Sequence, residues 1–77
     1  MIQFEIRYGK TQTMDEKVIH VEENEMVDGR LITKLEAKHK AFLIAKDLRK
    51  SNSYVEVSKW RLTGEKGLYL MWVKEIA

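Results

Sequence analysis

Between residues 2 and 8 every second side chain is apolar, and the side chains between them are polar or charged. This two-residue period is typical of a strand with one buried face. A second run, residues 17 to 22, is rich in β-branched side chains and follows a segment without periodicity, residues 9 to 13. The pattern therefore predicts an antiparallel hairpin at the start of the chain.

The middle of the chain has the period of a helix. Thr33 and Glu36 have the spacing of a capping box, in which both side chains accept hydrogen bonds from backbone N–H groups of the first turn. The helix is predicted to begin there, or one turn earlier with Asp28 as its cap, after a solvated acidic loop at residues 22 to 29. It ends at residues 51 to 53, Ser-Asn-Ser, which are poor helix formers. Its apolar stripe, wide enough to cover a sheet, is predicted to contain Leu31, Leu35, Ala37, Ala41, Phe42, Ile44, Ala45 and Leu48.

Two strand-like runs complete the chain, residues 54 to 62 and residues 68 to 74. The five residues between them, Thr63 to Gly67, include two glycines and favour a hairpin connection. The symmetric register pairs Leu62 with Leu68, Trp60 with Leu70 and Ser58 with Trp72.

This register gives the second hairpin two apolar faces. A single helix can cover one of them, and we expect it to cover the aliphatic face with Val55 and Val57. Tyr54, Trp60 and Trp72 then point outward, unless a one-residue shift in one strand mixes the two faces. The outward face is predicted to hold Tyr54, Trp60, Leu62, Leu68, Leu70 and Trp72, and the helix-covered face to hold Val55, Val57, Tyr69, Met71 and Val73 with Lys59 and Arg61.

Together these elements predict a single α+β domain over residues 1–77, of order β-β-α-β-β, with one amphipathic helix packed on a mostly antiparallel four-stranded sheet. A chain of 77 residues supports one core, since domains of about 60 residues bury only about 60% of their unfolded surface. The sequence contains no cysteine, so packing rather than disulfide bonds must stabilise the fold. No window approaches the roughly 20 apolar residues of a membrane-spanning helix, and the first residues alternate. We therefore expect a cytoplasmic protein without a membrane partner.

Charge is divided unevenly along the chain, beneath a formal net charge of +2. Residues 1 to 29 carry three basic and seven acidic side chains, whereas residues 30 to 77 carry eleven basic and five acidic ones. Residues 30 to 50, most of them in the predicted helix, hold seven of the basic side chains. Such a basic surface either keeps the domain soluble or neutralises the phosphates of an anionic partner.

The sequence contains none of the catalytic motifs that spacing alone reveals. It has no cysteine nucleophile, no G-x-S-x-G elbow and no phosphate-binding glycine loop. Its two histidines, His20 and His39, lack the spacing of a metal site, and we interpret them as a strand-edge and a helix-surface residue. We therefore expect no enzyme activity, no cofactor and no metal.

The aromatic and basic residues of the second hairpin are the most specific functional signal. Aromatic rings beside cations on a sheet face stack unpaired bases, although two tryptophans in so small a domain also suit a core-filling role. We predict a nucleic-acid-binding module, for single-stranded or double-stranded partners. The alternative is a protein-interaction module or a homodimer that buries the second sheet face. The predicted binding residues are Lys46, Arg49, Lys50, Tyr54, Lys59, Trp60, Arg61 and Trp72.

Overall fold

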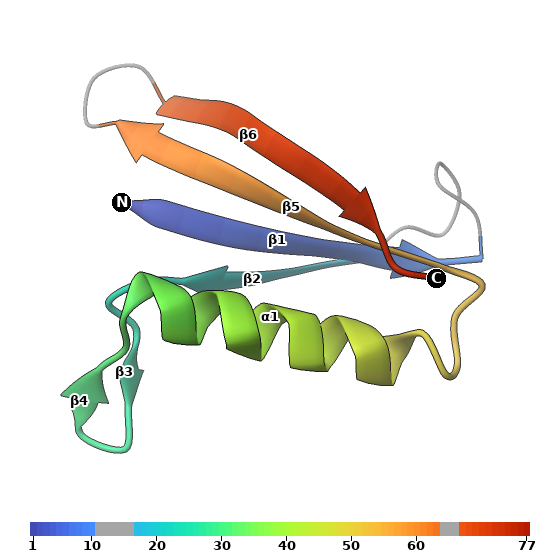
Figure 1. Cartoon of the computed structure of the whole chain (residues 1–77), viewed down its shortest axis with the longest axis horizontal. Helices are drawn as coiled ribbons and strands as arrows, with labels where there is room; N and C mark the ends of the chain where they lie inside the picture. The colour runs from blue at the N-terminus through green and yellow to red at the C-terminus, as the bar shows by residue number, and fades with distance from the viewer. Residues whose placement is uncertain (11–16, 64–66) are drawn as a thin grey trace.

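Four strands form one antiparallel sheet in a computed structural model of the chain, which describes residues 1–10, 17–63 and 67–77 (Figure 1). The order across the sheet is β2-β1-β5-β6. The two edge strands are therefore β2 and β6. The strands are β1 (Ile2–Gly9), β2 (Lys17–Glu22), β5 (Tyr54–Thr63) and β6 (Gly67–Glu75).

A single helix, α1 (Lys34–Leu48), packs on one face of this sheet, between its first and second hairpins in the chain. The predicted β-β-α-β-β arrangement and the α+β class are therefore confirmed. A further small hairpin, β3 (Met26–Val27) with β4 (Arg30–Leu31), precedes the helix. The predicted connections at residues 9–13 and 63–67 lie partly outside the described residues.

Strand β1 lies at the centre of the sheet because both of its edges are paired. Phe4 pairs with Val21 of β2, and Ile6 pairs with Val57 of β5. All four side chains are buried completely or almost completely against α1. The alternation at the start of the chain thus marks a buried strand face, as predicted. We call this face of the sheet the helix side and the opposite face the open side.

The acidic segment before the helix forms the small hairpin rather than the predicted loop. Its two strands are joined at Asp28 and Gly29, whose φ angles are 50° and 81°. Positive φ at two consecutive residues is typical of a type I′ turn, for which Asp-Gly is a preferred pair. Asp28 therefore belongs to a turn and does not cap the helix.

Helix α1 begins at the predicted capping box. The Glu36 N–H donates to the Thr33 hydroxyl at 3.2 Å, and the Thr33 N–H donates to the Glu36 carboxylate at 3.2 Å. At the other end the Asn52 side-chain amide donates to the Leu48 carbonyl at 2.8 Å. This bond satisfies one of the carbonyls that a helix C-terminus leaves without a partner. The helix ends at Leu48, three residues before the polar segment at residues 51 to 53 that was predicted to end it.

The helix contacts the sheet through a row of small side chains. Ala37, Ala41 and Ala45 are one turn apart and fully buried. The predicted apolar stripe of the helix wrongly includes two residues at its N-terminal end, Leu31 and Leu35. Leu35 is 74% exposed, because it lies about 120° around the helix axis from Ala41. Leu31 is also exposed, because it belongs to β4 and not to the helix.

The register of the second hairpin contains a β-bulge. Trp60 pairs with Leu70 as predicted, but Lys59 pairs with Trp72 and not with Met71. One extra residue on β6 therefore reverses the direction of every side chain that follows it. The predicted pairing of Leu62 with Leu68 is confirmed, and the predicted pairing of Ser58 with Trp72 is wrong, since Ser58 pairs with Val73.

The bulge moves Trp72 from the open side to the helix side. Its ring centroid lies 6.1 Å from that of Phe4 and 6.1 Å from that of Phe42. The expectation that Trp72 points outward is therefore wrong. The expectation that Val55 and Val57 pack under the helix is confirmed, since both are fully buried.

The helix does not cover the whole sheet. Within the described residues, α1 lies against β1, β2 and β5 but does not approach the backbone of β6, which lies at the far edge in Figure 1. Side chains alone, those of Phe42 and Trp72, bridge the remaining gap. An open groove therefore runs along the helix side of the sheet between α1 and β6.

Candidate nucleic-acid interface

The groove between α1 and β6 consists of two shallow hollows, of about 400 Å³ and 570 Å³. They adjoin, because Phe42 and Lys74 line both of them. The first is lined by Lys38, Phe42, Trp72, Val73 and Lys74, and the second by Phe42, Lys46, Arg49, Lys74, Glu75, Ile76 and Ala77. The groove thus has an aromatic floor and basic walls.

Two lysines of the groove lie over aromatic rings. The planes of Phe42 and Trp72 are stacked at 30°. Lys38 Nζ lies 6.0 Å from the Trp72 ring centroid, and Lys74 Nζ lies 5.9 Å from the Phe42 centroid. An ammonium group over a ring face is attracted by the ring quadrupole. The two ammonium groups therefore lie at the groove, beside its aromatic floor.

Strand β5 extends the basic surface toward the start of β6. Arg61 pairs with Ile2 on one side and Tyr69 on the other, and Lys59 pairs with Trp72. Directly paired residues of antiparallel strands point to the same face, so both cations lie on the helix side. With the basic residues of the two hollows they form one set, which we call the groove cations: Lys38, Lys46, Arg49, Lys59, Arg61 and Lys74.

The groove cations differ from the other basic residues in their pairing. On the outer side of the helix Lys40 binds Glu25 at 3.0 Å, and Arg30 binds Glu36 through both guanidinium ends. In the described part of the chain no carboxylate lies within ion-pair distance of a groove cation. In the described residues, the six positive charges around the groove therefore have no carboxylate partner, and an anionic ligand is their natural counterpart.

The open side of the sheet has the opposite character. Glu5 accepts a hydrogen bond from Arg7 at 2.6 Å and contacts His20 Nε2 at 3.1 Å. Burial alone raises the pKa of this carboxyl, but the hydrogen bonds from Arg7 and His20 outweigh it and lower the pKa below 4.5. The register also places Glu22 and Glu56 on this side. In the folded chain, the open side of the sheet therefore carries these acidic side chains and the helix side carries the groove cations.

Both outward aromatic residues of the open side already have hydrogen-bond partners. Trp60 Nε1 donates to the Ser58 hydroxyl at 2.9 Å, and the Tyr54 hydroxyl donates to Glu56 at 2.8 Å. Tyr54 and Trp60 thus lie on the open side, away from the groove. The structure does not bring them together with the predicted basic residues.

The predicted binding residues therefore separate into three groups. Lys46, Arg49 and Trp72 line the groove, and Lys59 and Arg61 lie beyond its lining on the same helix side of the sheet. Lys50 lies at the helix end and pairs with Asp47 at 3.7 Å. Tyr54 and Trp60 lie on the open side.

Sequence reasoning omitted Lys38, Phe42 and Lys74 from the site. The helical signal for the first two is present in the sequence, because Lys38, Phe42 and Arg49 recur at a spacing of four and seven residues and share one side of the helix. Lys74 has no comparable signal, since its face depends on the bulge.

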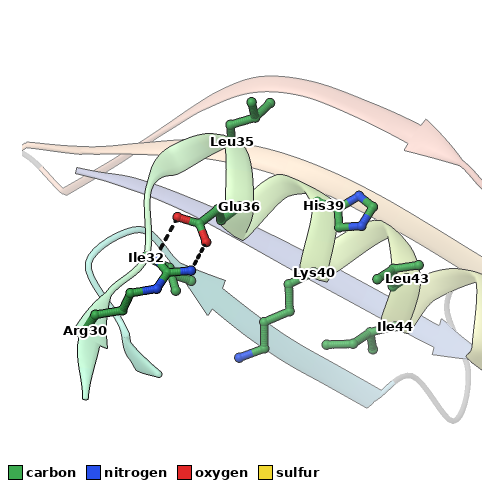
Figure 2. A pocket seen from close by; sticks show the side chains of 8 residues that line it. All are labelled: Arg30, Ile32, Leu35, Glu36, His39, Lys40, Leu43 and Ile44. Carbon is green, nitrogen blue, oxygen red and sulfur yellow. Dashed lines mark hydrogen bonds and ion pairs between the residues drawn. The ribbon is translucent and has the colours of Figure 1, made fainter. Parts of the chain in front are cut away.

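A third hollow, of about 810 Å³, lies along the outer surface of the helix (Figure 2). Its lining includes the exposed side chains of Leu35, His39 and Leu43, which form one row. The carboxylate nearest to this row is Glu36, whose hydrogen bonds to Arg30 and Thr33 lower its pKa to about 2. A carboxylate of such low pKa is a weak general base, so the hollow offers apolar contact rather than acid–base chemistry.

The described residues contain neither a cluster of metal ligands nor a membrane-spanning helix. Within residues 1–10, 17–63 and 67–77 no cluster of three or more histidine and acidic side chains is placed to hold a metal ion. In the same residues, no helix is both long enough and apolar enough to cross a bilayer.

Comparison with known proteins gave no relative: no family model, no curated protein and no solved structure matches the chain. The class that the fold and the groove define is a small α+β domain with one basic, aromatic-floored surface.

Proposed function

We propose that this chain is a non-enzymatic nucleic-acid-binding module and that the groove between α1 and β6 is its interface. The observation that carries the proposal is the set of six groove cations without carboxylate partners around an aromatic floor. Each phosphate that such a cation neutralises releases condensed counterions, which drives association at low salt. A cytoplasmic location stays a prediction from the sequence.

The aromatic residue best placed to stack a base is Tyr69. It is 49% exposed and pairs with Arg61 on the helix side of the sheet. Trp72 is less suitable, because Phe4, Phe42 and Lys38 already surround its ring. Bases stack on exposed rings when they are unpaired. We therefore favour a single-stranded ligand.

The first test compares two lysines of the same helix. Lys38 lies in the groove, whereas Lys40 lies on the outer side and pairs with Glu25. Binding of labelled single-stranded and duplex oligonucleotides is followed by fluorescence anisotropy at about 50 and 200 mM salt. The Lys38→Gln variant should bind single strands several-fold more weakly, and its slope of log K against log salt should fall by about 0.7, the contribution of one phosphate contact.

The matched control is Lys40→Gln, which removes the same charge from the other side of α1. It should leave the affinity and the salt slope almost unchanged, because its ammonium group does not face the groove. Equal losses in the two variants would show that net charge and not the groove binds the ligand. Absence of any binding at about 50 mM salt contradicts the proposal outright, since electrostatic binding is strongest there.

A further inference from the structure

Strand β6 is an apolar strand at an uncovered edge of the sheet. It is nine residues long, and α1 does not cover it. Five of its large side chains are between 48% and 51% exposed, namely Leu68, Tyr69, Leu70, Met71 and Val73. A long apolar edge of this kind presents free backbone N–H and C=O groups and favours pairing with another strand.

The other edge of the sheet is protected. Strand β2 carries Lys17, His20 and Glu22 along its six residues, and the helix packs against it. Charged side chains and a covering helix are the usual means of preventing edge-to-edge association. The two edges therefore differ, and β6 is the one open to a partner.

We propose that β6 pairs antiparallel with β6 of a second copy of this chain, so that two four-stranded sheets become one of eight strands. A two-fold axis lets the same edge meet itself and closes the assembly at two copies. Antiparallel pairing also places the charged end of each strand, Lys74 and Glu75, beside the apolar start of the other. Parallel pairing would instead bring like charges together.

The apolar area of the edge fits a dimer of modest affinity. Half-exposed side chains of this size leave on the order of 100 Å² each to bury. The four other than Tyr69, whose ring stays open to the groove, amount to about 400 Å² per copy before the strand backbone is counted, against about 800 Å² per partner in a standard interface. We therefore expect a weak and reversible dimer, because such an area lies below that of a standard interface.

Antiparallel pairing places both helices on the same side of the joint sheet, because its two-fold axis is perpendicular to the sheet. The two grooves then lie side by side over a shared floor of β6 strands. Tyr69 and Trp72, which face the helix side, belong to that floor in both copies. This joint groove rests on the proposed function, whereas the strand pairing itself does not.

Dimerisation and nucleic-acid binding should respond to salt in opposite directions. The groove cations of the two copies repel one another across the dimer axis, and salt screens that repulsion. Dimerisation should therefore become stronger as salt rises, whereas nucleic-acid binding should become weaker. The opposite signs allow each proposal to fail without the other.

The experiment is sedimentation equilibrium of the full chain between about 5 and 500 μM, at about 0.05 and 0.5 M salt. Leu70→Lys places a charge on the open side of β6, and Val18→Lys places the same charge on the open side of β2. The two side chains are similarly exposed, 51% and 46%. Leu70→Lys should raise the dissociation constant at least tenfold, and Val18→Lys should change it less than twofold.

Circular dichroism establishes that each variant is folded, and Leu68→Lys replaces Leu70→Lys if the latter is not. A native chain that stays monomeric at about 500 μM and high salt overturns the proposal, as do equal effects of the β6 and β2 variants. A folded monomeric variant that still binds oligonucleotides would leave the proposed function intact. A native dimer that binds no oligonucleotide would contradict the proposed function and support the proposed dimer.

Discussion

Glu5 is the most constrained charged residue of the open side. Its side chain is only 11% exposed, yet it carries a carboxylate on a central strand. Arg7 on the same strand and His20 on β2 compensate the charge. Their hydrogen bonds lower the pKa of Glu5 in the folded state despite burial, which acts in the opposite direction. The cluster therefore couples folding to pH.

The sign of that coupling gives a prediction for Glu5→Gln. A carboxyl whose folded pKa lies below 4.5 stabilises the native state at higher pH, and this contribution is lost as pH falls through the lowered value. The variant should be about 1 kcal/mol less stable than the native chain at pH 7, the usual effect of one such hydrogen bond. The difference should shrink at acid pH.

Urea unfolding at about pH 7 and pH 3 measures this difference. Asp47→Asn is the control, because Asp47 is 80% exposed and its ion pair to Lys50 is long, at 3.7 Å. A Glu5→Gln difference that is the same at both pH values would mean that packing, and not the carboxylate charge, accounts for the effect.

At the scale of the element, α1 packs against the sheet through the row of Ala37, Ala41 and Ala45. Ala41 is the middle member, fully buried between the helix and the sheet. Replacing it with leucine adds three carbons where no space exists, and overpacking of this kind costs about 1–3 kcal/mol. Ala41→Leu should therefore lower the free energy of unfolding by about that amount.

The matched control is Leu43→Ala, two residues further along and 55% exposed. It should change stability by less than about 0.5 kcal/mol, as is usual for surface positions. Thermal unfolding followed by circular dichroism distinguishes the two variants. If Ala41→Leu proves neutral, the helix does not approach the sheet as closely as the buried row requires.

The elements differ in how much of them the sequence predicts. The sequence predicts β1 from its alternating apolar residues, and it predicts the capping box from the fixed spacing of Thr33 and Glu36. The two-residue strands around Asp28 and Gly29 are too short for a period, although the Asp-Gly pair itself is a turn signal. The predicted strands and helix thus match where a local pattern is long enough.

No local sequence pattern predicts the bulge in β6. From Leu68 to Val73 every residue is apolar, so the period-two pattern that would fix its faces is absent. The extra residue, Met71, is revealed only by the pairing with β5. For this reason the sequence predicts most of the basic residues at the groove but assigns Trp72 to the wrong face and omits Lys74.

At the scale of the molecule, charge and apolar surface are arranged around one uncovered strand. The helix leaves β6 bare, which creates the groove on one of its faces and an open edge beside it. Among the described residues, Glu5, Glu22 and Glu56 lie on the open side and Glu25 and Glu36 are paired on the outer surface of the helix, whereas Glu75 lines one end of the groove. The two proposals therefore depend on the same feature, the position of α1 away from β6.

Because both proposals depend on the uncovered strand β6, the affinity of a dimer for a single strand should depend on the length of that strand. A short single strand of about 6 nucleotides fits one groove, whereas one of about 20 can reach both grooves of a β6-paired dimer. Binding the second groove is then intramolecular, so affinity rises beyond the sum of two separate contacts. The native chain should bind the longer strand at least tenfold more tightly than the shorter one at equal salt.

The monomeric Leu70→Lys variant decides whether that gain comes from the dimer. It keeps every groove cation, so it should bind the shorter strand as the native chain does and should lose most of the gain with length. Val18→Lys adds the same charge at the opposite edge and should retain the gain. Anisotropy titrations of the three proteins with both strands measure the ratio directly. A length gain that persists in Leu70→Lys would instead indicate that one groove alone follows a longer strand, with β6 pairing irrelevant to it.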